Sequence, residues 1–584
     1  MKGAAMLDLL LRGGDVVDGT GGPRVRANVG VRDGRIVSVG STSEPAARTI
    51  DVTGLVIAPG FVDIHTHYDA QLLWDPAATP SPLHGVTTVL AGNCGFTIAP
   101  VEPEHVDYVM RMMARVEGMP LESLRAGPAW QWRTFGEYLD RLEGRICVNA
   151  GFLVGHSTLR RVVMGDLAVG TPATAEQIAA MVQLAHESMA DGALGVSSSL
   201  GEAHTDGDGQ PVPSRAASRE ELLALARAVR EHEGTTLEFI AAMGEISDER
   251  IVLMTDMSLT ANRPLNWNLL GSLSPTEVYE QQLTSCDHAR AHGARVVALT
   301  LPDVMRMRAS RVIEDLPGWR DIVALPAEER RRRVQDPAVR AQLRAGAHEA
   351  AARGLGAMAR FDLLEIAEDP PGAAESVAGR SVAEVAAARG ADPIDVLIDV
   401  VLPDRLPLQM VFPSLVPSLG VSDESWQARA AVWRDDRTVL GGSDAGAHVD
   451  LMCHANYTTV LLGESVRERG LLTLESAVHQ ITDVPARLYG LRERGRVCEG
   501  WYADLVVFDP DRIGSEPARA RHDLPGGGLR LYAEAVGVAH VFVNGTEIVR
   551  DNVITGEPAG TLLRSGRDTD TVTVPGGERG RAGH

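Results

Sequence analysis

Lysine is almost missing from this sequence: Lys2 is the only one among 584 residues, and every other permanently cationic side chain is an arginine. Lys2 also precedes the first candidate strand, so it lies outside any predicted core. Catalytic chemistry that requires a lysine amine or a modified lysine inside the fold is therefore excluded.

Cysteine is also scarce, and long apolar runs are missing. The five cysteines are an odd number without a CxxC pair, which argues against a disulfide framework and for a reducing compartment. No stretch approaches the roughly 20 apolar residues that a membrane span needs. The first residues are typical of a β-strand rather than of a signal peptide. We therefore expect a soluble, cytoplasmic protein.

An excess of positive charge is missing as well. The formal net charge is −22, whereas a nucleic-acid groove or a contact with an anionic membrane requires a basic stripe. We expect a small molecule as the partner, with no nucleic acid and no membrane. A homo-oligomer is compatible with the sequence, which shows no interface.

The two ends of the chain share one sequence pattern, that of short strands separated by turns. Residues 6–57 and 495–554 contain short alternating apolar and polar runs separated by Gly-Gly, Asp-Gly, Pro-Gly and Asn-Gly, dipeptides that are typical of hairpin turns. We predict a composite β-sandwich domain from residues 1–59 and 484–563.

The middle of the chain alternates short β-branched runs with helical stretches. Ile178, Met181, Val182 and Ala185 form a stripe of 3.6-residue period, and Ser218 with Glu221 fits a capping box. Repeated strand–helix units predict an α/β fold, and the length favours a (β/α)8 TIM-like barrel over residues 60–483. The lack of a GxGxxG motif disfavours an open doubly wound sheet.

Two segments depart from this repeat. Residues near 305–354 are arginine-rich and helical, and we interpret them as an inserted solvated helical pair over the barrel mouth in preference to an anion site. Residues 564–584 are rich in glycine, arginine and threonine, which predicts a flexible tail.

The sequence GFVDIHTHYDA places two histidines at the end of an apolar strand. His65 and His67 are two residues apart, so both imidazoles point to one face of the strand. In a barrel that face is the interior, and active sites lie at the carboxyl ends of the strands. Paired imidazoles suit a divalent metal, with zinc favoured.

Two later motifs end in chemically useful residues. A strand in TVLGGSDAGAH leads into Asp444, a carboxylate that could bind a metal and take a proton from an attacking water. Cys94, between Asn93 and Gly95, follows another strand and could offer a thiolate to zinc. Taken alone, Asp444 could be an ordinary helix cap and Cys94 a half-buried thiol.

In order, the motifs PGFVDIHTH, GVTTVLAGNCG, LVGHSTLR, GALGVSSSL, LGGSDAGAH and GLRERGRVCEGWYADLVVFDP resemble the amidohydrolase superfamily, and within it the D-aminoacylase (N-acyl-D-amino-acid deacylase) branch. The resemblance implies a (β/α)8 barrel with a composite β-sandwich. It implies His65, His67 and Cys94 as metal ligands, and Asp444 as both ligand and general base. His156 and Ser199 match motif positions that line or support the site.

The resemblance fails at two ligand positions. It implies histidines from the fifth and sixth barrel strands, but the corresponding segments, TTLEFIAAM (235–243) and RPLNWNLLG (263–271), contain none. Glu238 falls near the first position and Asn268 near the second. Three interpretations remain: one metal held by His65, His67 and Asp444 with help from Cys94 or Glu238; a scaffold that has lost its metal; or other ligands, drawn from the histidines His84, His204, His448 and His454.

Substrate recognition also departs from the family. The branch binds the substrate's carboxylate with a lysine and an arginine, and neither is found at the matching place here. Arg215, Arg306 and Arg308 are candidate replacements, although for each of them a position on the solvated surface is the favoured interpretation. The lack of lysine also excludes centres that bridge two metals with a carboxylated lysine.

The sequence thus predicts a metal-dependent hydrolase of amide bonds, most simply a deacylase of N-acyl-D-amino acids. It predicts one divalent ion per chain, zinc, in preference to two. The alternative is a catalytically altered or inactive scaffold that acts as a binding or assembly protein.

Overall fold

The structure is a computed structural model that describes residues 6–242, 244–268, 270, 276–302, 305–308, 316–352, 364–366, 369–370, 376–377, 380–403, 408–412 and 423–577. In that part of the chain no helix is long and apolar enough to cross a membrane. All five cysteines are free, which agrees with the predicted lack of a disulfide framework.

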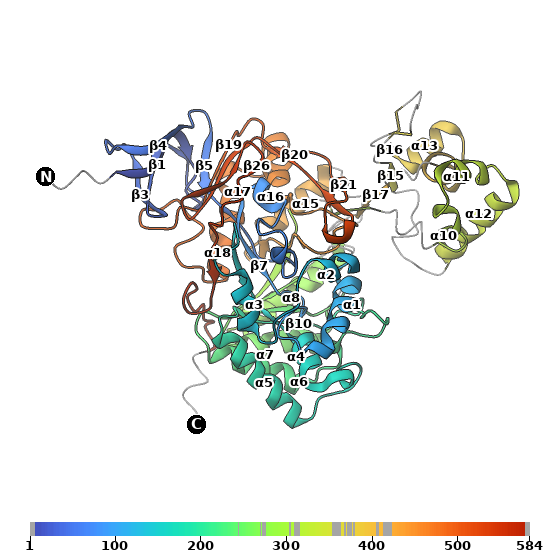
Figure 1. Cartoon of the computed structure of the whole chain (residues 1–584), viewed down its shortest axis with the longest axis horizontal. Helices are drawn as coiled ribbons and strands as arrows, with labels where there is room; N and C mark the ends of the chain where they lie inside the picture. Colours follow the sequence, from blue (N-terminus) through green and yellow to red (C-terminus); the bar gives the residue numbers. More distant parts are fainter. Residues whose placement is uncertain are drawn as a thin grey trace.

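Strands from both ends of the chain form one nine-stranded sheet (Figure 1). Its order is β26-β25-β24-β19-β5-β1-β2-β3, with β4 paired to β1. The strands are β1 (Leu7–Val16), β2 (Val25–Arg32), β3 (Arg35–Gly40), β4 (Ala46–Asp51), β5 (Val56–Pro59), β19 (Leu505–Phe508), β24 (Val538–Val543), β25 (Thr546–Arg550) and β26 (Val553–Ile554).

Two predicted hairpin turns occur where the sequence places them. Asp33 and Gly34 connect β2 to β3, and Asn544 and Gly545 connect β24 to β25, each pair with positive φ at both positions. Such turns match the twist of paired strands and favour Asn-Gly or Asp-Gly. The seam between the two ends of the chain is the antiparallel pair β5–β19.

Parallel strands occupy the middle of the chain. One sheet has the order β18-β13-β12-β11-β10-β9 and another β27-β8-β7-β6. Their bounds are β6 (Phe61–Asp63), β7 (Val86–Ala91), β8 (Asn149–Phe152), β9 (Val154–Gly155), β10 (Gly195–Ser199), β11 (Thr236–Ile240), β12 (Leu265–Trp267), β13 (Val296–Thr300), β18 (Thr438–Leu440) and β27 (Leu562–Leu563). The fold is α/β, as the sequence predicts.

Helices follow the parallel strands: α1 (Val106–Val116), α2 (Leu121–Ala126), α3 (Phe135–Leu142), α4 (His156–Met164), α5 (Ala175–Ala190), α6 (Arg219–Arg230), α7 (Asp248–Ala261), α8 (Thr276–Ala291), α15 (Asp423–Trp433), α16 (Tyr457–Val460), α17 (Leu474–Ile481) and α18 (Asp483–Leu488). In α5 the predicted stripe faces inward, with Met181 and Ala185 fully buried.

The predicted capping box of α6 forms only in part. Ser218 accepts a hydrogen bond from Glu221 N, but the Glu221 carboxylate does not return to the Ser218 backbone. It turns into the interior instead, toward His156 and Arg160.

The insertion extends beyond the predicted 305–354 to Phe412, and it contains strands as well as the predicted helices. It comprises β14 (Met305–Arg308), α10 (Arg320–Val323), α11 (Ala327–Arg333), α12 (Pro337–Ala352), β15 (Leu364–Ile366), β16 (Arg380–Ser381), α13 (Val382–Arg389), α14 (Pro393–Val396) and β17 (Leu408–Phe412). β14 and β15 both pair antiparallel with β17. Figure 1 shows α10–α13 set apart from the parallel strands.

The segment predicted as a tail begins with ordered contacts. Thr569 is buried and donates to Gly234 O, and Arg492 N donates to Asp568 O. The mobility of residues 564–584 and the domain boundaries at 59, 483 and 563 stay predictions.

Candidate metal centre

Three donor side chains meet at the carboxyl ends of the parallel strands. His65 and His67 follow β6 and Cys94 follows β7, and their ligand atoms all lie within 4.8 Å of one another. Cys94 Sγ is 3.3 Å from His65 Nε2 and 3.8 Å from His67 Nε2. All three side chains are buried.

Asp444, which follows β18, supplies a fourth donor to the same point. Its Oδ1 lies 3.2 Å from His65 Nε2 and 3.6 Å from His67 Nε2. The Asp444 side chain is 18% exposed, so this donor also faces the opening of the site. The structure therefore brings together all four residues that the sequence proposes as ligands.

Backbone hydrogen bonds explain this convergence. Asp444 N donates to His65 O, and His67 N donates to Ala445 O, so the loop after β18 runs alongside the segment after β6. Cys94 and Asp444 have φ values of 58° and 51°. Non-glycine residues rarely adopt such values, which concentrate at functional sites.

The geometry of these donors fits a divalent metal. Ligands of a tetrahedral zinc ion, at about 2.0–2.3 Å from it, lie about 3.3–3.6 Å from each other. The four separations between these donor atoms run from 3.2 to 3.8 Å and include this range. Two imidazoles, a thiol and a carboxylate are also the donor types that zinc prefers.

The charges around these donors also favour a bound cation. Burial alone would lower the pKa of His67, but the nearby carboxylates of Glu117 and Asp444 raise it to about 9. Burial raises the pKa of Glu238 to about 8. Burial would also raise the pKa of Asp444, yet His65 and His67 hold it well below the usual range. Several buried carboxyl groups around two imidazoles favour a bound cation.

Residues at the two unmatched ligand positions face the same cluster. Glu238, on β11, accepts a hydrogen bond from Cys94 N at 2.8 Å. Asn268, just after β12, places Nδ2 3.2 Å from His65 Nε2. Where the resemblance implies histidines, the chain thus presents a carboxylate and an amide.

His156 and Ser199 form hydrogen bonds with side chains outside the donor cluster. His156 Nδ1 contacts Ser198 Oγ at 2.8 Å, and its Nε2 contacts Glu221 Oε1 at 2.7 Å. Both ring nitrogens are therefore engaged, and His156 supports β10 against α6. Ser199 Oγ contacts His204 Nδ1 at 2.8 Å.

Of the arginines proposed as carboxylate anchors, Arg215 is the one whose side chain the structure describes. Arg215 donates to the backbone oxygens of Glu202 and His204. The side chains of Arg306 and Arg308 lie outside the described residues. Of the alternative ligands, His84 contacts Thr459 Oγ1 and Ala533 O, which occupy both of its ring nitrogens.

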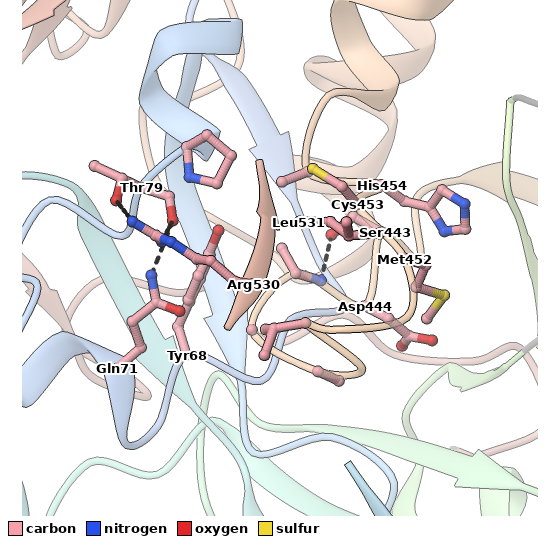
Figure 2. A pocket seen from close by; sticks show the side chains of 16 residues that line it. Tyr68, Gln71, Thr79, Ser443, Asp444, Met452, Cys453, His454, Arg530 and Leu531 are labelled. Carbon is pink, nitrogen blue, oxygen red and sulfur yellow. Dashed lines mark hydrogen bonds between the residues drawn. The ribbon is translucent and has the colours of Figure 1, made fainter. Parts of the chain in front are cut away.

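A pocket opens beside Asp444 (Figure 2). It is lined by residues of the loop after β18 and by Tyr68, Gln71, Thr79, Arg530 and Leu531. In Figure 2 the Arg530 side chain extends toward Thr79, to which it donates two hydrogen bonds, while Asp444 lies on the other side of the pocket.

Sequence reasoning missed Glu117, the residue after α1. Its Oε2 lies 3.4 Å from His67 Nδ1, and the side chain is 4% exposed. One signal was present: an acidic residue at the carboxyl end of a helix opposes the helix dipole, so it calls for another reason to be there.

The fold is α/β, and a cluster of two histidines, a cysteine and an aspartate lies at the carboxyl ends of its parallel strands. Together these features define the class of protein, a metal-dependent hydrolase. The chain matches the amidohydrolase family over residues 48–549 and belongs to it. D-aminoacylase from Alcaligenes xylosoxydans xylosoxydans is 31% identical over 560 residues, which cover 95% of this chain and 97% of the relative. N-acyl-D-glutamate deacylase from the same organism is 29% identical, with 97% and 98% covered.

Solved structures agree with these relatives. A D-aminoacylase studied for its binuclear metal centre has a TM-score of 0.62 at 29% identity, with 96% of this chain and 100% of that chain covered. N-acyl-D-glutamate deacylase from Bordetella bronchiseptica, in complex with zinc and a phosphonate inhibitor, has a TM-score of 0.63 at 25% identity, with the same coverage. The comparisons thus support the amidohydrolase resemblance that the sequence motifs carry.

Proposed function

We propose that this protein is a zinc-dependent deacylase that hydrolyses the amide bond of N-acyl-D-amino acids or closely related amides. The convergence of His65, His67, Cys94 and Asp444 carries the proposal. The substrate class is supported by D-aminoacylase and the deacylases of N-acyl-D-aspartate and N-acyl-D-glutamate, which this chain resembles over nearly its full length.

The donor set would hold one metal ion through His65 Nε2, His67 Nε2, Cys94 Sγ and Asp444 Oδ1. When bound, such an ion polarises an amide carbonyl and makes water more acidic. Asp444 accepts the proton of the attacking water and delivers it to the leaving nitrogen, since its carboxylate is ionised and faces the opening. A single ion is favoured because Glu238 and Asn268 stand where a second set of histidines would be needed.

We also propose that the parallel strands close into a single (β/α)8 barrel. Two contacts support closure: Leu194 N donates to Phe152 O between β8 and β10, and Thr66 and Ala445 form a parallel bridge beyond β6 and β18. This closure would place every proposed ligand at one mouth.

The variant Asp444→Asn tests the mechanism. We expect kcat for N-acyl-D-amino acids to fall by about 10²–10⁴-fold, the usual contribution of a general base, with the circular dichroism spectrum unchanged. Release of free amino acid is the assay, and the N-acyl-L-amino acids serve as matched controls. Undiminished turnover by the variant would remove Asp444 from the mechanism.

A further inference from the structure

Both histidines of the metal centre have a buried nitrogen that faces away from the other donors. The Nε2 atoms point to Cys94 and Asp444, while His65 Nδ1 and His67 Nδ1 are buried without a hydrogen-bond partner among the described residues. An imidazole that ligates a metal through Nε2 carries its proton on Nδ1, and that proton needs an acceptor.

A carboxylate lies beside each of these nitrogens. Glu117 Oε2 is 3.4 Å from His67 Nδ1, and Glu238 Oε1 is 4.0 Å from His65 Nδ1. The first separation is close to a hydrogen bond, and the second is an electrostatic contact. Glu238 Oε1 is itself buried without a hydrogen-bond partner in the described structure, so donor and acceptor face each other.

Each of these two glutamates also bonds to a loop that carries another ligand, Glu238 through its carboxylate and Glu117 through its backbone carbonyl. Glu238 Oε2 accepts the hydrogen bond from Cys94 N, and Cys94 has the uncommon positive φ. Glu117 O accepts from His448 N in the loop that follows Asp444. Gly118, with φ 58°, permits this approach, because a Cβ there would lie 3.1 Å from His448 Cα.

The geometry points to Glu117 and Glu238 as positioning residues of the metal centre: Glu117 orients His67, and Glu238 orients His65 and Cys94. This inference rests on the metal centre of the proposed function. A carboxylate that accepts the Nδ1 proton fixes the ring and makes Nε2 a stronger donor. The position at which a histidine ligand is missing is thus used by Glu238 to support the remaining ligands.

The test measures zinc affinity in the full-length protein by competition with a chromophoric chelator. Loss of such a supporting group weakens metal binding by about 10–100-fold, so we expect this loss in both Glu117→Gln and Glu238→Gln. Glu122→Gln removes an exposed carboxylate near Glu117 and is expected to keep the wild-type affinity.

Two further measurements separate positioning from a general loss of structure. The absorption spectrum of the cobalt-substituted protein is expected to change in both variants, whereas the melting temperature without metal is expected to stay near that of the wild type. Glu117→Asp keeps the charge but withdraws it by one methylene, and we expect an intermediate zinc affinity.

Wild-type zinc affinity and an unchanged cobalt spectrum in both glutamine variants would overturn the inference. Failure of the wild-type protein itself to bind zinc would overturn the proposed function together with it. The two failures are distinguishable because the first leaves the wild-type metal centre intact.

Discussion

Cys94 and Asp444 are the two proposed ligands with positive φ, and Cys94, at φ 58°, has a buried side chain that is 5% exposed. Burial and the neighbouring carboxylates, Glu238 first among them, raise the pKa of this thiol well above its usual range. A cation that binds the sulfur would offset this cost. Cys94 is therefore better explained by metal binding than by packing.

This explanation predicts the behaviour of Cys94→Ser. A hydroxyl is a much poorer zinc ligand than a thiolate, so we expect zinc affinity to fall by at least about tenfold. Isothermal titration with zinc measures the change. Cys147→Ser is the matched control, because Cys147 is also a buried free cysteine but is not part of the donor cluster. Equal losses in the two variants would contradict a ligand role for Cys94.

At the residue scale the sequence identifies groups that motifs place at strand ends and misses groups that depend on contacts between distant segments. His65, His67 and Asp444 stand out because an apolar strand runs directly into each of them. Glu117 reaches His67 from the end of a helix some 50 residues along the chain, and no periodicity reports that contact.

Among the elements, β10, α4 and α6 are joined by a buried polar network. Glu221 on α6 accepts from Arg160 and contacts His156 Nε2, both on α4, and His156 Nδ1 contacts Ser198 on β10. Arg160 and Glu221 are at most 1% exposed. The network holds two helices against the strand that lies beside β11 and Glu238.

Removal of the Glu221 charge should destabilise this part of the fold. Glu221→Gln leaves Arg160 buried without its counter-charge, which costs about 3–5 kcal/mol in the free energy of unfolding. Urea denaturation measures the loss, and the exposed Glu220→Gln serves as control. Equal unfolding free energies for the two variants would contradict the account.

The stability lost in Glu221→Gln should also depend on pH. His156 and Arg160 outweigh burial and lower the pKa of Glu221 in the folded protein, so its stabilising effect is complete above the unfolded value of about 4.3. The effect is lost as the pH falls from there toward the lower folded value. The stability difference between wild type and Glu221→Gln should therefore shrink on acidification.

Helices and turns could be predicted where a single local sequence pattern determines them. The Asn544–Gly545 turn and the α5 stripe follow from local sequence and occur as expected. The second half of the Ser218 capping box does not form, because the interior offers Glu221 stronger partners in Arg160 and His156. Strand β14 was missed because the arginine-rich helices dominate the pattern of residues 305–354, whereas β15, β16 and β17 lie beyond the segment predicted as the insertion.

For the whole molecule, the joint between the terminal sheet and the parallel strands depends on Asp504. Its carboxylate binds Arg494, accepts from Asn149 Nδ2 on β8 at 3.0 Å and accepts from Asn544 N at 2.8 Å. Asp504 O also accepts from Gly60 N, directly before β6. One buried residue, through its carboxylate and its backbone oxygen, thus links both ends of the chain to the sheet that bears His65.

Asp504→Asn should therefore lower the stability of the whole molecule. It leaves Arg494 buried without a counter-charge, and we expect the free energy of unfolding to fall by about 3–5 kcal/mol. Thermal and urea unfolding with the exposed Asp511→Asn as control measure this. A melting temperature that matches the control would show that Asp504 is not needed at the joint.

The sheet made from both ends of the chain could be predicted, because both ends show the alternating strands and turn dipeptides of hairpins. The placement of β27 was not: Leu562–Leu563 lies within the predicted sandwich segment but pairs with β8. Two apolar residues carry too little pattern to specify a sheet, and only the three-dimensional arrangement selects their partner.

The most direct test of the account is the metal content of protein purified without added metal or a histidine tag, measured by inductively coupled plasma mass spectrometry for wild type and His65→Ala. The account predicts about one zinc per wild-type chain and its loss in the variant. A metal-free wild type, or a variant that retains all of its zinc, would contradict a centre built on His65, His67, Cys94 and Asp444.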